Sequence, residues 1–229
     1  MIRIGLIAAV VVGCGGGGAG PAQPVARAVC GVAGEAVRIA ISDDIQALAG
    51  CRALAGGLDI RSGALRDVVG LEKLESIAGS LIVGPTLQLG SLRGLDGLQT
   101  IGGDLDITGN PNLMGVYLAS LRRVTGDVSI DRVRAVTTVS LHALVEVGGS
   151  FEVTDNGGLL RLDIGALRTV GGDFKVEENA LLEDLVVDSM GHAGGEVGLD
   201  GNSTLDPSII SALAKRLTTL EHIDPMISD

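Results

Sequence analysis

The sequence contains very few aromatic residues. Aromatic side chains make up 1% of the 229 residues, with two Phe, one Tyr and no Trp. A chain that is 46% hydrophobic must therefore build its core from Leu, Val and Ile. Narrow coils accept such side chains easily, and the length suits a single domain of this type.

Basic residues and histidines are also scarce. With 17 Lys and Arg against 28 Asp and Glu, the formal net charge is -11, which argues against binding to nucleic acid or adsorption to an anionic lipid surface. The three histidines are His142, His192 and His222, and none has a Cys or a second His at metal-ligand spacing. No G-x-S-x-G motif occurs either. We therefore expect a protein without catalytic activity, metal or cofactor.

A glycine opens the pattern G-x-apolar-x-apolar seven times. The start-to-start spacing is 23 residues except for one step of 24, from Gly79 to Gly103. A period of this length predicts a solenoid, in which each coil buries its apolar face by stacking on its neighbours. The seven matches are Gly56–Ile60, Gly79–Val83, Gly103–Ile107, Gly126–Ile130, Gly149–Val153, Gly172–Val176 and Gly195–Leu199.

Two further patterns run in phase with the glycines. An apolar triplet at spacing three precedes each glycine, from Leu48, Cys51 and Leu54 to Val187, Met190 and Ala193. Seven residues after four of the glycines stands an asparagine, whose stacked copies could form a ladder along one edge. These are Asn110, Asn156, Asn179 and Asn202. Glycine itself is abundant, and we attribute this to positive backbone angles at the corners of the coils.

The alternation after each glycine predicts one strand per coil with one buried face. Strands at the same phase in successive coils form a parallel sheet with rungs roughly 4.8 Å apart. Phe151 and Phe174 share one phase in consecutive coils, so we expect their rings to stack in the core. Asp206 followed by Pro207 and an apolar stripe predicts a C-terminal helix that covers the last coil.

The N-terminus resembles a bacterial lipoprotein signal. Arg3 precedes an apolar run, and Val11 to Cys14 is similar to a lipobox, which implies a signal peptide over 1–13 and lipid attachment at Cys14. An ordinary secretory signal is the alternative. Residues 14–26 are then a Gly- and Pro-rich tether. In this scheme an exported chain permits Cys30 and Cys51 to form a disulfide that holds an N-terminal cap over 27–55.

The repeat L-x-x-L-x-x-I-x-G-x-L-x-I-x-x-N, together with a first coil that reads Asp43 to Cys51, resembles the receptor L-domain over residues 30 to 220. The resemblance implies a right-handed, leucine-rich-repeat-like parallel β-solenoid that acts in extracellular recognition. The coils then span 56–205, and 206–229 form the C-terminal cap and tail. The resemblance implies no catalytic residue.

Positions one, three and five after each glycine face outward from the predicted sheet, and ten of them are acidic while two are basic. We expect this face to bind a basic protein or peptide, or a cell-surface glycan, rather than calcium. Nine acids form the candidate site: Asp104, Asp106, Asp127, Asp131, Glu152, Asp173, Glu177, Glu196 and Asp200.

These observations together predict a monomeric, lipid-anchored recognition or adhesion module on the bacterial outer membrane or cell surface. Two alternatives remain open at the level of the sequence. One is a passive envelope spacer protein, and the other is a solenoid that cleaves polysaccharides with carboxylates.

Overall fold

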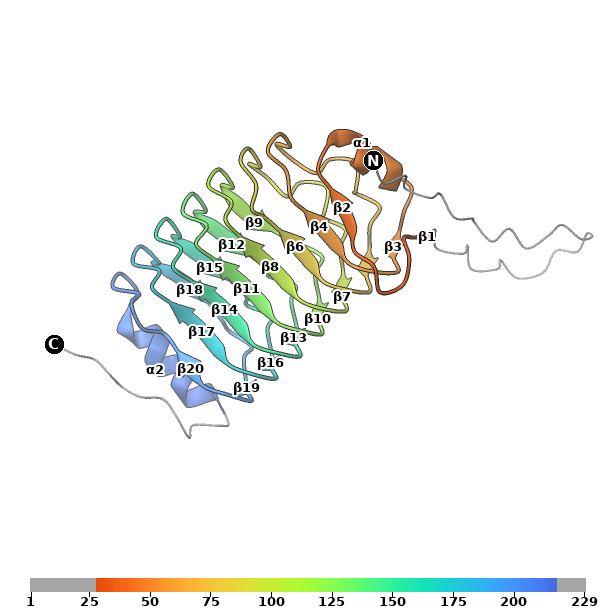
Figure 1. Ribbon diagram of the computed structural model, residues 1–229. Coiled ribbons are helices and arrows are strands. Elements are labelled where there is room, and N and C mark those ends of the chain that lie inside the picture. Colours follow the sequence, from red (N-terminus) through yellow and green to blue (C-terminus); the bar gives the residue numbers. More distant parts are fainter. Residues whose placement is uncertain (1–27, 218–229) are drawn as a thin grey trace, which may run out of the picture.

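A computed structural model describes residues 28–217 and shows a parallel β-solenoid of about seven coils. Figure 1 shows the coils stacked along one axis, with helix α1 (Ser42–Leu48) near one end and helix α2 (Pro207–Arg216) at the other. The described strands form three sheets, which we call A, B and C, and every pair of neighbouring strands is parallel. The predicted fold class is therefore confirmed.

The seven glycine motifs form the strands of sheet B, and an eighth strand comes from the N-terminal segment. Successive motifs pair in register, so that Val128 lies opposite both Leu105 and Phe151. In order, the strands of sheet B are β2 (Val37–Ile39), β4 (Leu58–Ile60), β6 (Leu81–Val83), β8 (Leu105–Thr108), β11 (Val128–Asp131), β14 (Phe151–Thr154), β17 (Phe174–Glu177) and β20 (Val197–Gly198).

Sheet A contains the last residue of each apolar triplet and lies immediately before sheet B in every coil. Its strands are only two residues long. They are β1 (Val29–Cys30), β3 (Ala53–Leu54), β5 (Ser76–Ile77), β7 (Thr100–Ile101), β10 (Arg123–Val124), β13 (Glu146–Val147), β16 (Thr169–Val170) and β19 (His192–Ala193).

Sheet C follows the asparagine positions in the later coils. Its four strands are β9 (Gly115–Tyr117), β12 (Thr138–Ser140), β15 (Arg161–Asp163) and β18 (Asp184–Val186). The one strand per coil that the glycine motif predicts is confirmed in sheet B, but sheets A and C add two further strands to these coils. The apolar residues of these additional strands continue a spacing of three, which does not indicate a strand.

The core runs the length of the solenoid and is almost entirely aliphatic. The predicted inward residues of the first six motifs of sheet B and the apolar triplets are buried, including the degenerate last triplet that ends at Ala193. Val197 and Leu199 in the last motif are only partly buried. Phe151 and Phe174 lie opposite each other on β14 and β17, with ring centroids 5.5 Å apart and planes 15° apart. This confirms the predicted stack.

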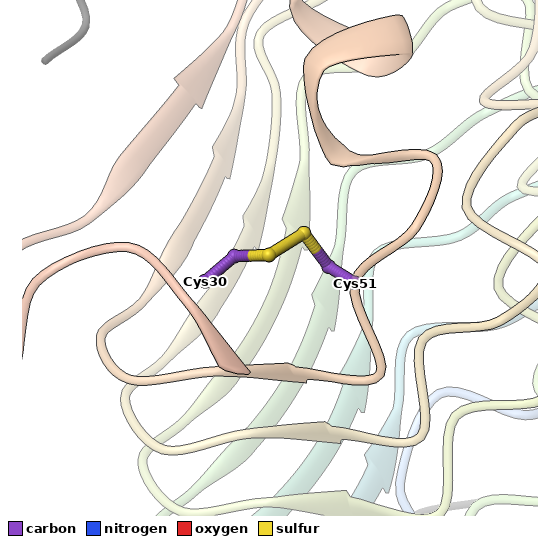
Figure 2. The surroundings of a disulfide bond; sticks show 2 residues. All are labelled: Cys30 and Cys51. Atoms are coloured by element: carbon purple, nitrogen blue, oxygen red, sulfur yellow. A yellow bond between two sulfur atoms is a disulfide. The ribbon is translucent and has the colours of Figure 1, made fainter. Parts of the chain in front are cut away.

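The two ends are closed in different ways. At the N-terminal end, Cys30 on β1 is bonded to Cys51, with their Cα atoms 5.8 Å apart (Figure 2). Because β1 and β2 pair with β3 and β4, the predicted cap over 27–55 is itself a coil of the solenoid. At the other end, α2 begins as predicted, with the Asp206 carboxylate accepting from the Ser208 N–H, and it buries Leu213.

Candidate functional site

The motif glycines mark the corner between sheets A and B. None of the seven has a positive φ, so our attribution of these glycines to positive backbone angles was wrong. The glycines are required by close packing of successive coils instead. A Cβ on Gly149 would overlap the Asp127 carboxylate and lie 3.0 Å from the Gly126 carbonyl carbon, and Gly126 and Gly195 are equally confined by Asp104 and Asp173.

The residues directly after these glycines form a column of hydrogen bonds along this corner, which we call the glycine-corner column. Each side chain accepts from the backbone N–H of the residue at the same position in the next coil. The Asp104 carboxylate accepts from Asp127 at 3.0 Å, and the Asp127 carboxylate accepts from Ser150 at 2.7 Å. Ser150 continues the column by accepting from Asp173, whose carboxylate accepts from Glu196. Ser80 begins it by accepting from Asp104.

The opposite edge of sheet B carries the predicted asparagine ladder, which is buried. The Asn179 side-chain amide donates to the carbonyl of Val153 in the preceding coil and to that of Glu177 in its own, both at 2.8 Å. Its side-chain oxygen accepts from the N–H of Asn156 at 3.1 Å. Thr86 joins the ladder by donating its hydroxyl to Asn110 at 2.7 Å.

A left-handed residue precedes the ladder position in five coils. Two of these residues are glycines, but three are not, and φ lies between 52° and 72° at all five. The residues are Gly109, Arg132, Asp155, Glu178 and Gly201. A left-handed backbone costs a residue with a Cβ about 1–2 kcal/mol, so the ladder must offset this strain in three coils.

Between these two edges, the outer face of sheet B is a checkerboard of carboxylates and hydroxyls. On β8 the outward pair is Asp106 and Thr108, whereas on β11 the order reverses to Ser129 and Asp131. On β14 the order reverses again, to Glu152 and Thr154. On these three strands the carboxylates of one column are separated by a hydroxyl, and two rungs place them roughly 10 Å apart. The alternation ends at the last two strands, where Glu177 and Asp200 lie in one column on adjacent rungs.

Three of the nine predicted acids form ion pairs. Lys175 lies 2.9 Å from Asp173 and 3.7 Å from Glu196, and Asp131 is paired with Arg132 at 2.6 Å. The hydrogen bond from Lys175 is the main reason why the pKa of Asp173 is lowered, and the same bond raises the pKa of Lys175.

Four of the nine have neither a hydrogen bond nor an ion pair to their carboxylates within residues 28–217: Asp106, Glu152, Glu177 and Asp200. Partial burial is the main cause that raises the pKa of Asp106, although Arg61 opposes the shift. Burial likewise raises the pKa of Glu177, which the charge of Asp200 reinforces and that of Lys175 opposes. Burial therefore makes the charge of Asp106 and Glu177 costly in the absence of a cation that offsets it.

The structure therefore divides the predicted site into two groups. Asp104, Asp127, Asp173 and Glu196 lie in the glycine-corner column, and the first three of them join successive coils. Ser150 also lies in this column, and its hydroxyl accepts a hydrogen bond as the carboxylates do. Lys175, one of the two bases among the outward positions, pairs with two of these acids.

Other chemistry is sparse in residues 28–217. No three His, Cys, Asp or Glu side chains gather there in a way that could hold a metal ion. His142 contacts only Ser140, at 3.3 Å, on the exposed surface. A cavity of about 280 Å³ beside α1 includes none of the nine acids; it is lined by Ser42, Ile45, Gln46, Ala64, Leu65, Arg66, Asp67 and Val69.

The predicted signal peptide, tether and lipid site at Cys14 lie outside the described residues, as does His222. Neither helix between residues 28 and 217 has the length and apolar character needed to cross a membrane. Comparison of the chain with protein-family models, with curated proteins and with solved structures finds no match in any of the three.

Proposed function

We propose that this protein is a lipid-anchored surface protein whose solenoid, similar to the receptor L-domain, is a non-catalytic recognition or adhesion module. Its partner is a basic protein or peptide that binds the outer face of sheet B. The observation that carries the proposal is the set of unpaired, partly buried carboxylates on this face, above all Asp106, Glu152 and Glu177.

The arrangement of these carboxylates favours an extended partner. They lie in two columns that follow the solenoid axis, and from β8 to β17 the carboxylates within each column lie about 10 Å apart. An exposed ion pair stabilises a complex by only about 0.2–1 kcal/mol, so useful affinity requires several pairs at once. A flat face with regularly spaced charges offers this to a partner whose cations repeat at a similar interval.

The location rests on the lipobox-like segment that ends at Cys14. Lipid attachment there would place the solenoid on the membrane through a tether of about a dozen residues. The variant Cys14→Ser should no longer partition into the detergent phase after phase separation. Continued partitioning of this variant would contradict the anchor and leave the binding face unaffected.

The binding face is tested with a fluorescently labelled deca-arginine peptide. We expect the triple variant Asp106→Asn, Glu152→Gln and Glu177→Gln to bind it at least about tenfold more weakly. The matched control removes three exposed acids elsewhere, Glu35→Gln, Asp43→Asn and Glu183→Gln, and should retain the affinity. Equal losses in both variants would show a nonspecific charge effect and overturn the proposal.

Salt and pH sharpen the test. Affinity of the wild-type chain should fall as the salt concentration rises, because screening weakens exposed charge pairs. It should also fall as the pH is lowered toward 5, because the raised pKa of Asp106 and Glu177 causes these groups to lose charge before ordinary carboxyls do. The triple variant should not show this early pH dependence.

A further inference from the structure

Tyr117 is the only tyrosine of the chain and lies on β9, the first strand of sheet C. Its ring folds back over Gly115, two residues earlier on the same outer face. A Cβ on Gly115 would overlap the ring and lie 3.0 Å from Cζ and 3.1 Å from the hydroxyl oxygen. Gly115 is buried, while the Tyr117 side chain is 50% exposed. The glycine thus provides the space in which the ring rests on the sheet with one side toward solvent.

Hydroxyls and a guanidinium group follow along the same face. The next strand, β12, places Thr138 beside Gly115 and Ser140 beside Tyr117. One rung further, Arg161 and Asp163 occupy the corresponding positions on β15, and Asp184 lies beside Arg161 on β18. Arg161 contacts both aspartates, at 3.3 Å from Asp163 and closely with Asp184. Polar donors and acceptors therefore begin one rung from the ring and continue to about 10 Å from it.

The charge on this face differs from that of sheet B. Its eight outward strand positions hold one base and two acids, and the base is paired with both acids. Exposed apolar residues precede two of these strands, with Met114 before β9 71% exposed and Leu160 before β15 42% exposed. A nearly neutral surface that combines an aromatic ring with hydroxyls does not attract a charged partner in preference to an uncharged one.

We propose that the outer face of sheet C holds a binding subsite for a neutral glycan, with a pyranose ring packed on Tyr117. The apolar C–H face of a sugar packs against an aromatic ring, and its hydroxyls require donors and acceptors such as Thr138, Ser140 and Arg161. This site adds a second ligand to the proposed recognition module. It does not depend on the carboxylates of sheet B, so either site can fail without the other.

The single tyrosine supplies a direct measurement. Because the chain has no Trp, its tyrosine emission reports on Tyr117 alone. Titration of the full chain with cellohexaose, chitohexaose and maltohexaose should produce a saturable change of emission with at least one sugar, at roughly millimolar affinity. Calorimetry should give the same affinity. The absence of a saturable response with all three sugars would overturn the proposal.

Variants separate stacking from other effects. Tyr117→Phe keeps the ring and should bind within about threefold of the wild type, whereas Tyr117→Ala should lose at least about tenfold by calorimetry. Gly115→Ala should weaken binding by displacing the ring, while Gly157→Ala, where a Cβ meets nothing within 4 Å, should not. Sugar binding that Tyr117→Ala leaves unchanged would overturn the proposal. So would an emission change caused by deca-arginine and by none of the sugars.

Discussion

The two edges of sheet B join the same coils with different chemistry. At the asparagine ladder the linking groups are buried and neutral, and each amide supplies donors as well as an acceptor. At the glycine-corner column the linking groups are solvent-accessible and mostly charged, and the carboxylates among them supply only acceptors. The difference shows that burial decides which side chain can serve, because a buried carboxylate would lose hydration without a compensating cation.

The largest effect should come from placing a charge in the buried ladder. Asn179→Asp replaces a donor to the carbonyls of Val153 and Glu177 with an acceptor, so we expect it to lower the free energy of unfolding by about 4 kcal/mol. Asn179→Ala should cost about 3 kcal/mol, because it leaves the same carbonyls without their donor. Urea unfolding followed by circular dichroism measures both. A cost below 1 kcal/mol would mean that the ladder does not hold the coils together.

Substitutions at the glycine corner should come next. Gly126→Val and Gly172→Val each force a side chain against the preceding coil, and we expect a loss of about 3 kcal/mol for each. The two losses should be similar because the glycines occupy one position of the repeat. Gly157→Val, at an exposed turn with open space around the Cβ, should cost much less in the same urea unfolding experiment. A similar cost at Gly157 would mean that backbone flexibility, rather than close packing, explains the motif.

Removing one acceptor from the glycine-corner column should cost less, since water can replace it. Asp127→Ala leaves the N–H of Ser150 without its partner, and we expect a loss of about 1 kcal/mol, like that of a helix N-cap. Asp127→Asn keeps an acceptor oxygen and should lose about half as much. If the Ala variant were as stable as the wild type, the glycine-corner column would not stabilise the fold, and only a role in ligand binding would remain for it.

The smallest effects concern the left-handed residues before the ladder. Gly109→Ala introduces a Cβ at φ 64° and should lower the free energy of unfolding by about 1 kcal/mol. Asp155→Gly removes a Cβ at φ 52° but increases the freedom of the unfolded chain, so its net gain should be about 0.5 kcal/mol at most. Chemical denaturation resolves the opposite signs. A loss on Asp155→Gly would show that the backbone there is not strained.

Much of the fold could be predicted because the repeat is so regular. The strands of sheet B, the buried triplets, the asparagine ladder and the stack of Phe151 on Phe174 all follow from residues at a constant phase. Sheets A and C could not be predicted, since their apolar residues continue a spacing of three rather than the alternation that marks sheet B. The reason for the motif glycines could not be predicted either. A sequence shows that a position lacks a side chain, but it does not show whether close packing or a positive φ requires the glycine.

The sequence could place the candidate site on one face of sheet B. It could not show which of the acids join neighbouring coils and which are available to a ligand. The pattern located Asp104, Asp106 and Asp127 on the same face of sheet B. It could not show that the column residues Asp104 and Asp127 turn toward the next coil's backbone while the face residue Asp106 keeps its carboxylate without a partner. That distinction depends on the offset between coils, which places the N–H of one residue against the side chain of another 23 positions away. The periodicity fixes the spacing, and only the folded geometry fixes the pairing.

The constant period has a consequence for how the molecule could change in length. In each coil that begins at Gly149, Gly172 or Gly195, the residue after the glycine donates its N–H to the side chain at the same position of the preceding coil. At the ladder, the asparagine of each of these coils both donates to the preceding coil and accepts from it. An in-frame duplication or deletion of residues 149–171 would therefore join surfaces that already match. The contacts at the two ends of the solenoid would not change. The protein can therefore gain or lose whole coils, which changes the length of its proposed ligand-binding faces, while each coil keeps the same packing and hydrogen bonds.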